Sequence, residues 1–330
     1  MIKQTELKQL KTGDDLNHFF ILNKLEVKLT KTNKEYLNLE LRDKSASVPA
    51  KVWDNVENIK NKIKEGDLVK VAGVMEEFNS QPQIKIVKIH PVKEEDNVTH
   101  ADFLPVSKRD FNEMKKEFEN RVSKISNSFL NQIVKNIFTE SNFAKYSKAP
   151  AGKAWHHSYV HGLLEHTLEI IKICDLMCDI HHELNRDLLI SGAMLHDFGK
   201  TEELQFDSTF DYTDKGKLLG HIVIAALEIE KAALKIPNFP DDLKNQLIHL
   251  VLSHQGKLEY ASPVEPKTLE AIVLYHADEL SAKTNAYKSA IQNDEQTGGS
   301  WTRYLPLAGT SLFIPPDDSQ NDKPKETLFD

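Results

Sequence analysis

Hydrophobic and polar residues alternate with a period of two along about the first 90 residues, the pattern of half-buried strands. The alternation falls into short runs rich in β-branched and aromatic residues, separated by polar turns. These runs cover residues 20–29, 36–41, 48–53, 68–75 and 84–89. Between the third and fourth runs, residues 55–64 show helical spacing instead and stop at Gly66. Three strands, a helix and two strands is the order of an OB-fold barrel.

A charged segment without periodicity, residues 93–108, follows the strands and is predicted to be a linker. Beyond it, hydrophobic residues recur every three to four positions, as in amphipathic helices. This helical pattern covers residues 111–125, 129–138, 162–182, 186–196, 218–235, 241–253 and 267–290. The sequence therefore predicts a multi-domain protein, with an all-β OB-fold barrel in residues 1–92 and an all-α bundle in residues 109–314. Residues 315–330, rich in Asp, Lys and Pro, are predicted to be a disordered tail.

Histidines and acidic residues recur at particular places in the helical half, near the end of a predicted helix or inside one. They occur in the order His, His-Asp, His, His, Asp, at His166, His196, Asp197, His221, His254 and Asp278. Neutral imidazole nitrogens and carboxylate oxygens ligate divalent transition metals, and the helices of a bundle can direct them to its core. A carboxylate can bridge two ions about 3.5–4 Å apart, and such a pair activates a water and stabilises a leaving oxygen.

This order resembles the HD-domain phosphohydrolase superfamily in its two-metal form. The signature doublet is His196-Asp197, and Lys200 completes the variant written HDxGK. The resemblance implies that one ion is held by His166, His196, Asp197 and Asp278. It implies that the other is held by His221 and His254, with Asp197 as the bridge. Asp197 and Lys200 are the predicted catalytic residues, Lys200 as a phosphate or leaving-oxygen contact. The alternatives are a packed or exposed role for each histidine, and a surface position for Lys200.

The two halves together resemble the YhaM family of bacterial 3′→5′ exoribonucleases, from about residue 14 to residue 310. The segments that carry the resemblance are residues 34–39, 50–54 and 162–167. The resemblance implies manganese dependence and the degradation of single-stranded RNA, with single-stranded DNA as a further ligand or substrate of some members. The polarity of degradation and the preference for ribose rest on this resemblance alone.

The outer face of the barrel carries candidate nucleic-acid-binding residues. In the predicted second and third strands, the leucines and valines share one face, which leaves the alternate positions on the other. These positions are Tyr36, Asn38, Lys51 and Trp53, and Phe78 is a further candidate in the loop before the last strand. Aromatic rings that stack on bases, beside a lysine that meets phosphate, form a usual single-strand platform. The alternative is that Tyr36 and Trp53 pack against the neighbouring helix or the helical domain.

Three more histidines, His156, His157 and His161, cluster just before the first ligand helix. His157 and His161 are predicted as possible contacts of the substrate phosphate. Surface or helix-capping roles are equally open for this cluster.

Charge alone neither favours nor excludes a nucleic-acid partner. The net charge is −8 over 330 residues, but residues 1–92 carry 16 Lys and Arg against 13 Asp and Glu. The excess of acidic residues therefore lies in residues 93–330, together with the candidate metal site. Bound cations would offset part of this negative charge. The sequence shows no membrane span and no secretory signal, and its two cysteines lie four apart in a predicted helix. A cytoplasmic protein without a membrane partner is expected, and its oligomeric state stays open.

The sequence thus predicts a metal-dependent phosphodiesterase that removes nucleoside 5′-monophosphates from the 3′ end of single-stranded RNA, with single-stranded DNA as a further substrate. Two divalent ions are the expected cofactors, with Mn²⁺ favoured over Fe²⁺ or Co²⁺, because the ligand set holds no thiolate. One alternative is an HD enzyme acting on a small nucleotide, and the aromatic face of the barrel argues against it. Another is a DNA-binding factor with a vestigial HD site, and the complete ligand set argues against that.

Overall fold

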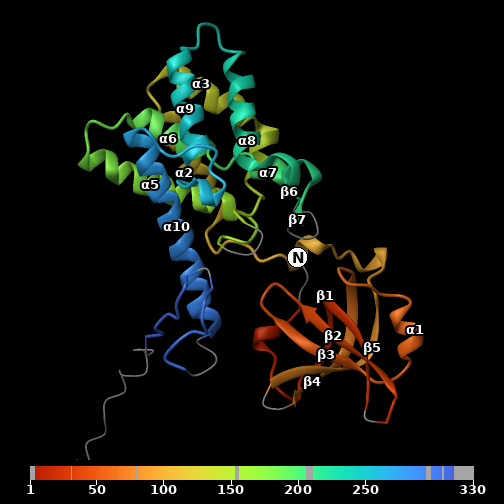
Figure 1. Ribbon diagram of the computed structural model, residues 1–330. Coiled ribbons are helices and arrows are strands. Elements are labelled where there is room, and N and C mark those ends of the chain that lie inside the picture. The colour runs from red at the N-terminus through yellow and green to blue at the C-terminus, as the bar shows by residue number, and fades with distance from the viewer. Residues whose placement is uncertain are drawn as a thin grey trace, which may run out of the picture.

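The computed structural model, shown in Figure 1, describes residues 4–30, 32–78, 81–152, 156–205, 211–294, 299–306 and 308–315. The strands of the first part gather in one barrel, and the helices of the second part gather in a separate bundle (Figure 1). The expected order of a β domain followed by a helical domain is confirmed. Apart from Pro315, the predicted tail at residues 315–330 lies outside the described residues.

The β domain is a closed five-stranded barrel with the strand order β1-β2-β3-β5-β4. Its strands are β1 (Asp15–Leu29), β2 (Glu35–Arg42), β3 (Ser47–Val52), β4 (Leu68–Phe78) and β5 (Gln81–Pro91). Helix α1 (Val56–Lys60) lies between β3 and β4 in the chain, as the spacing of its hydrophobic residues predicts. Neighbouring strands are antiparallel except β3 and β5, which run parallel. The OB-fold order is therefore confirmed.

Alternation along the strands builds the core of the barrel. Leu37, Leu39 and Leu41 of β2 are buried, whereas the residues between them are half-buried. The pairing of β2 with β3 sets Asn38 opposite Lys51, on the outer face. Removing the leucines from water stabilises the fold by about 1.5–3 kcal/mol for each side chain. The same alternation directs polar and aromatic residues of β2 and β3 outward.

The helical domain follows a segment with two short 3₁₀ helices, η2 (Glu94–Asp96) and η3 (His100–Phe103). Its helices are α2 (Phe111–Ser123), α3 (Ser128–Ile137), α4 (Glu140–Tyr146), α5 (Gly162–Ile180), α6 (Arg186–Leu195), α7 (Lys200–Glu203), α8 (Asp214–Ala233), α9 (Asp241–Ser253) and α10 (Leu269–Asp294). The hydrophobic spacing did not indicate α4 or α7. Nor did it indicate the hairpin of β6 (Leu204–Gln205) and β7 (Asp211–Tyr212).

Helix α6 is the centre of the bundle, because it packs against α3, α5, α9 and α10. Every residue from Leu188 to Leu195 is buried, so this helix is surrounded by protein on all sides. Gly192 of α6 lies against Leu250 of α9, and a Cβ at Gly192 would overlap that leucine. The chain that follows α6 therefore starts from a rigid position inside the domain. No helix of the described ranges is long and apolar enough to cross a membrane.

Candidate metal centre and nucleic-acid face

The predicted metal ligands lie on or directly after five helices, and their ligand atoms cluster inside the domain. His166 lies in the second turn of α5, and Asp278 lies within α10. His196 and Asp197 directly follow α6, and His254 directly follows α9. The structure therefore brings together residues that are far apart in the sequence.

His221 reaches the same place from inside a bent helix. The hydrophobic spacing predicted a helix from about residue 218, but α8 begins at Asp214, where the Thr213 side chain accepts a hydrogen bond from the amide of Gly216. The helix bends at Gly220, which has φ +71°, a backbone conformation that suits glycine. The bend comes directly before His221.

The carboxylate of Asp197 stands at the centre of these ligands and faces a different pair of histidines with each oxygen. Its Oδ2 lies 3.2 Å from Nε2 of His196 and 3.8 Å from Nε2 of His166. Its Oδ1 lies 3.4 Å from Nε2 of His221 and 3.7 Å from Nε2 of His254. Oδ1 of Asp278 lies 3.0 Å from Nε2 of His166, on the first side. This is the arrangement that a bridging carboxylate between two cations requires.

The hydrogen bonds of the centre are consistent with cation binding. The Nε2 atoms of His166, His196 and His221, and Oδ1 of Asp197, are buried and have no hydrogen-bond partner. Leaving a polar group buried and unpaired costs about 1–3 kcal/mol. Nδ1 of His196 lies 2.8 Å from the carbonyl oxygen of Ala193, so Nδ1 carries a proton and Nε2 is the atom that faces Asp197. The residues present therefore fit two divalent cations.

Two ligand histidines are held by side chains that no sequence motif indicated. Nδ1 of His221 lies 2.9 Å from Oε1 of Glu203, at the end of α7. Nδ1 of His166 lies 3.0 Å from Oγ of Ser281, whose hydroxyl donates to Glu169 at 2.7 Å. Carboxylates and hydroxyls in this position fix the tautomer and the direction of a metal-binding imidazole.

Burial and local charge set the protonation of the centre. Burial lowers the pKa of His254 to about 3 and holds the pKa of His166 well below its usual value, so both imidazoles are neutral, as metal ligands must be. Burial acts to raise the pKa of Asp197, but the Lys200 ammonium and His196 outweigh it and hold that pKa well below the usual range. Asp197 is therefore ionised, the form that can bridge two cations.

Lys200 is part of the centre, because its Nζ donates to Oδ2 of Asp197 at 2.7 Å and the residue is only 8% exposed. This burial excludes the alternative of a surface lysine. Gly199, directly before it, lies against the backbone of His221, and any Cβ there would overlap the His221 carbonyl oxygen. The glycine of the HDxGK motif thus allows the close approach of α7 and α8. The catalytic role of Lys200 stays a prediction.

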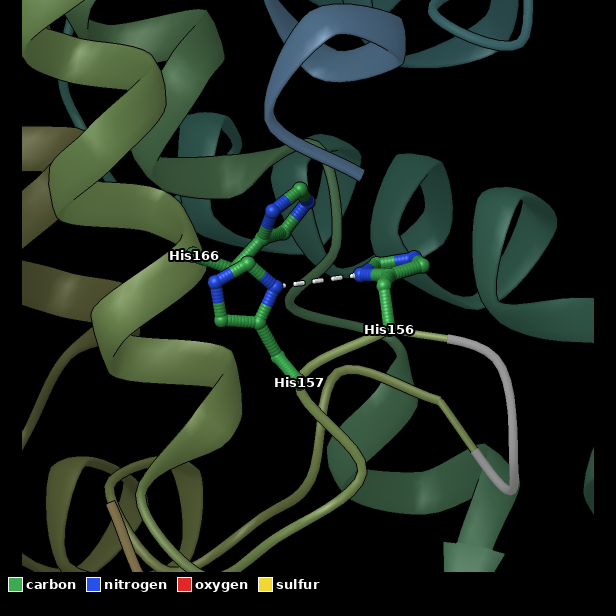
Figure 2. A group of neighbouring side chains, drawn as sticks. All are labelled: His156, His157 and His166. Carbon is green, nitrogen blue, oxygen red and sulfur yellow. Dashed lines mark hydrogen bonds between the residues drawn. The ribbon is translucent and has the colours of Figure 1, made fainter. Parts of the chain in front are cut away.

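Figure 2 shows the rings of His156 and His157, from the loop before α5, beside the ring of His166. The His156 ring centroid lies 4.8 Å from that of His166. His157 is 1% exposed, and its Nε2 lies 3.2 Å from Oε2 of Glu169. The His161 ring stacks on Phe111 with centroids 4.8 Å apart. His157 and His161 therefore have internal partners, and their contact with substrate stays a prediction.

The outer face of the barrel brings the predicted binding residues together. The rings of Tyr36 and Trp53 stack with centroids 4.8 Å apart and an angle of 22° between their planes. Nζ of Lys51 lies 4.3 Å from the ring centroid of Phe78 and 5.8 Å from that of Trp53. Phe78 is the last residue of β4 and not part of a loop, because β4 extends to it in pairing with β5. The Asn38 amide donates to Glu26 at 3.2 Å.

Both domains match known protein families. The HD domain matches residues 163–283, a range that includes all the predicted metal ligands. The OB-fold nucleic acid binding domain matches residues 24–92. The chain is 31% identical over 304 residues to 3′-5′ exoribonuclease YhaM of Bacillus subtilis, covering 92% of this chain and 96% of that protein. It is 31% identical over 299 residues to 3′-5′ exoribonuclease YhaM of Listeria innocua, covering 90% of this chain and 94% of that protein.

The chain belongs to the YhaM family. The expected family and the expected order of domains are thereby confirmed. The predicted metal ligands of this YhaM-family chain converge as the order of residues predicts, whereas Glu203, Ser281 and Glu169, which contact them directly or through one another, were missed. Glu203 and Ser281 reach their histidines through folding, from 18 and 115 positions away, so no fixed spacing indicates them. Glu169 is on the same helix as His166 but is linked to it through the Ser281 hydroxyl.

Proposed function

We propose that this YhaM-family chain is a metal-dependent 3′→5′ exoribonuclease that releases nucleoside 5′-monophosphates from single-stranded RNA, with single-stranded DNA as a second substrate. The main support is the Asp197 carboxylate, whose two oxygens face two different groups of histidines. The chain is also similar over nearly its whole length to proteins named 3′-5′ exoribonuclease. We further propose a cytoplasmic location, and domain limits at residues 1–92 and 109–314 with residues 93–108 as the linker.

The chemistry follows from the donor set. Two divalent ions, Mn²⁺ by our proposal with Fe²⁺ or Co²⁺ as alternatives, lower the pKa of a water and stabilise the leaving oxygen when bound. His166, His196 and Asp278 would hold one ion and His221 and His254 the other, with Asp197 shared. Lys200 lies beside Asp197 and can meet a phosphate oxygen with its ammonium group.

Hydrolysis on this scheme breaks the bond between phosphorus and the 3′ oxygen of the penultimate nucleotide. The proton of the attacking water leaves to solvent, and the 3′ oxygen takes up a proton. The terminal nucleotide departs with its phosphate, as a nucleoside 5′-monophosphate, and the shortened chain keeps a 3′-hydroxyl. The product can therefore serve as the next substrate.

We assign the binding of longer RNA to the barrel face defined by Tyr36, Lys51, Trp53 and Phe78, with Asn38 beside it. Support comes from the stacked rings and the lysine among them, which suit bases and phosphates without sequence preference. This face should contribute to the affinity for RNA and not to the rate of hydrolysis, because it contains none of the predicted metal ligands.

The test uses single-stranded RNA labelled at its 5′ end, incubated with the protein and Mn²⁺ and resolved by length. We expect stepwise shortening, and release of labelled mononucleotide first when the label is at the 3′ end. Asp197→Ala is the control that should leave both substrates intact. Internal cleavage fragments, or no shortening by the wild-type protein, would contradict the proposed function.

A further inference from the structure

A pocket of about 190 Å³ opens directly beside the metal centre. Three of its lining residues, Lys200, His254 and Asp278, belong to the centre itself, and His156 lies next to them. The other side is lined by residues to which the metal chemistry gives no role, among them Gln255, Tyr260, Tyr275 and Lys283. Two larger hollows of about 540 and 500 Å³ contain none of the predicted metal ligands.

Two tyrosines give this pocket an aromatic side. Tyr260, at the end of η4 (Leu258–Tyr260), is 50% exposed, so part of its ring is open to a ligand. Tyr275 on α10 is held in place by Gly256, which has φ +78° and lies so close that any Cβ would overlap the ring. An exposed ring beside a fixed one is suited to a planar, partly apolar group such as a nucleobase.

Polar groups surround these rings. The Gln255 amide nitrogen lies 3.3 Å from Nε2 of His254, which places this amide between the aromatic side and the metal centre. Nζ of Lys257 lies 5.4 Å from the ring centroid of Tyr260, and Nζ of Lys283 pairs with Glu279 at 2.6 Å. The pocket thus offers the Gln255 amide and the ion pair of Lys283 with Glu279 beside a stacking surface, and Lys257 lies over one of the rings.

We infer that this pocket binds the 3′-terminal nucleoside of the substrate, with its base stacked on Tyr260. The inference rests on the proposed function and deepens it, because it names the residues that recognise the end of the chain. The volume is below the roughly 300 Å³ at which pockets for drug-sized ligands begin, so the pocket has room for about one base and not for several nucleotides. A terminal nucleotide held there would have its 5′ phosphate towards the Lys200 ammonium and the predicted ion sites.

The first test measures binding and needs no hydrolysis. The Mn²⁺-loaded protein is titrated with adenosine 5′-monophosphate and with ribose 5-phosphate, which lacks the base, and the ratio of the two affinities is measured. The wild-type protein is expected to prefer the first by roughly five- to 150-fold, the range that about 1–3 kcal/mol of base–aromatic stacking corresponds to. Tyr260→Leu should bring the ratio close to one, and Tyr260→Phe, which keeps the ring, should retain it.

Tyr212→Leu is the matched control, since Tyr212 is also an exposed tyrosine of the helical domain, 41% exposed, and does not line the pocket. It should keep the wild-type ratio. The inference is overturned if Tyr260→Leu keeps the preference for the base, if the wild-type protein shows none, or if adenosine 5′-monophosphate does not bind. Because this readout is independent of RNA cleavage, an inactive wild-type protein would refute the proposed function and leave the pocket assignment to be decided by binding.

The second test identifies which nucleotide occupies the pocket. RNA oligomers carry one abasic residue at the last, second-last or third-last position, and initial release of the terminal nucleotide is timed. The wild-type protein should be slowed most by the abasic residue at the last position, and Tyr260→Leu should lose that discrimination. Discrimination that depends on Tyr260 at the second-last position would overturn the assignment of the terminal nucleoside.

Discussion

Replacing Tyr36 and Trp53 together by alanine removes the stacked pair from the outer face of the barrel. The two rings cover one face of each other, so the pair presents at most two outward faces to bases. Each base–aromatic contact contributes about 1–3 kcal/mol, and 1.4 kcal/mol corresponds to a factor of ten in affinity. If both faces hold a base, the loss is about 2–6 kcal/mol, so the double variant should bind long single-stranded RNA more weakly than the wild-type protein, by roughly tenfold or more.

Lys51→Ala tests the electrostatic part of the same face. Its ammonium lies over the rings of Phe78 and Trp53 and pairs with no carboxylate in the described ranges, so it is available to a phosphate. On a single strand, each lysine–phosphate pair contributes about 0.7 to the steepness with which log affinity falls against log salt. The variant should therefore show a shallower slope than the wild-type protein. The assay is a titration of fluorescent RNA at several salt concentrations.

The matched control is Phe19→Ala. Phe19 also lies under a lysine, because Nζ of Lys70 is 4.8 Å from its ring centroid. This pair lies on β1 and β4 and is not part of the proposed RNA-binding face. We expect this variant to bind long RNA as the wild-type protein does. The double aromatic variant should hydrolyse a trinucleotide at the wild-type rate, because the barrel face contains none of the predicted metal ligands and the shortest substrates depend least on it.

Equal loss of activity on long RNA and on the trinucleotide would refute the platform, because it would show that the rings support the fold or the helical domain. No change on either substrate would also refute it. RNA would then enter by another surface, and residues 156–161 beside the metal centre would be the place to examine.

Three further predictions concern the helical domain. Glu203→Gln should weaken Mn²⁺ binding roughly 10–100-fold in a metal titration, because it alters the partner that holds Nδ1 of His221, and unchanged binding would show that Glu203 does not position this ligand. Gly192→Ala should lower the free energy of unfolding by about 1–3 kcal/mol in urea, because its Cβ would overlap Leu250. A gain in stability would mean that the helix propensity of alanine, about 1 kcal/mol, outweighs the overlap. Excess chelator should abolish RNA hydrolysis and added Mn²⁺ should restore it, whereas full activity in chelator would contradict metal dependence.

The alternation of residues predicted the barrel because its strands bury one face and expose the other. The pattern placed the first strand at residue 20, but β1 begins at Asp15. Residues 15–19 contain no β-branched side chain, and they are held as a strand by pairing with β4, in which Asp15 lies opposite Val74. Such a partner from another part of the chain leaves no local signal.

The order of histidines and aspartates predicted the metal centre because ligand chemistry restricts which residues can serve. The residues that hold the ligands were not predictable in this way. Ser281 is 115 positions from His166, and Glu203 is part of a four-residue helix too short to show periodicity. The pocket residue Tyr260 likewise lies on a 3₁₀ helix of three residues. These contacts are created by packing of the helices and can be known only from the structure.

Asp197 is proposed to be a shared ligand of two metal ions. The number of Mn²⁺ ions bound per chain tests this most directly. The protein is stripped with chelator, dialysed against Mn²⁺ and analysed for metal and for protein, with folding checked by circular dichroism. We predict two ions per chain for the wild-type protein, one for His254→Ala, and a loss of both tight sites for Asp197→Ala. A single ion in the wild-type protein, or two ions retained by folded Asp197→Ala, would contradict the shared carboxylate.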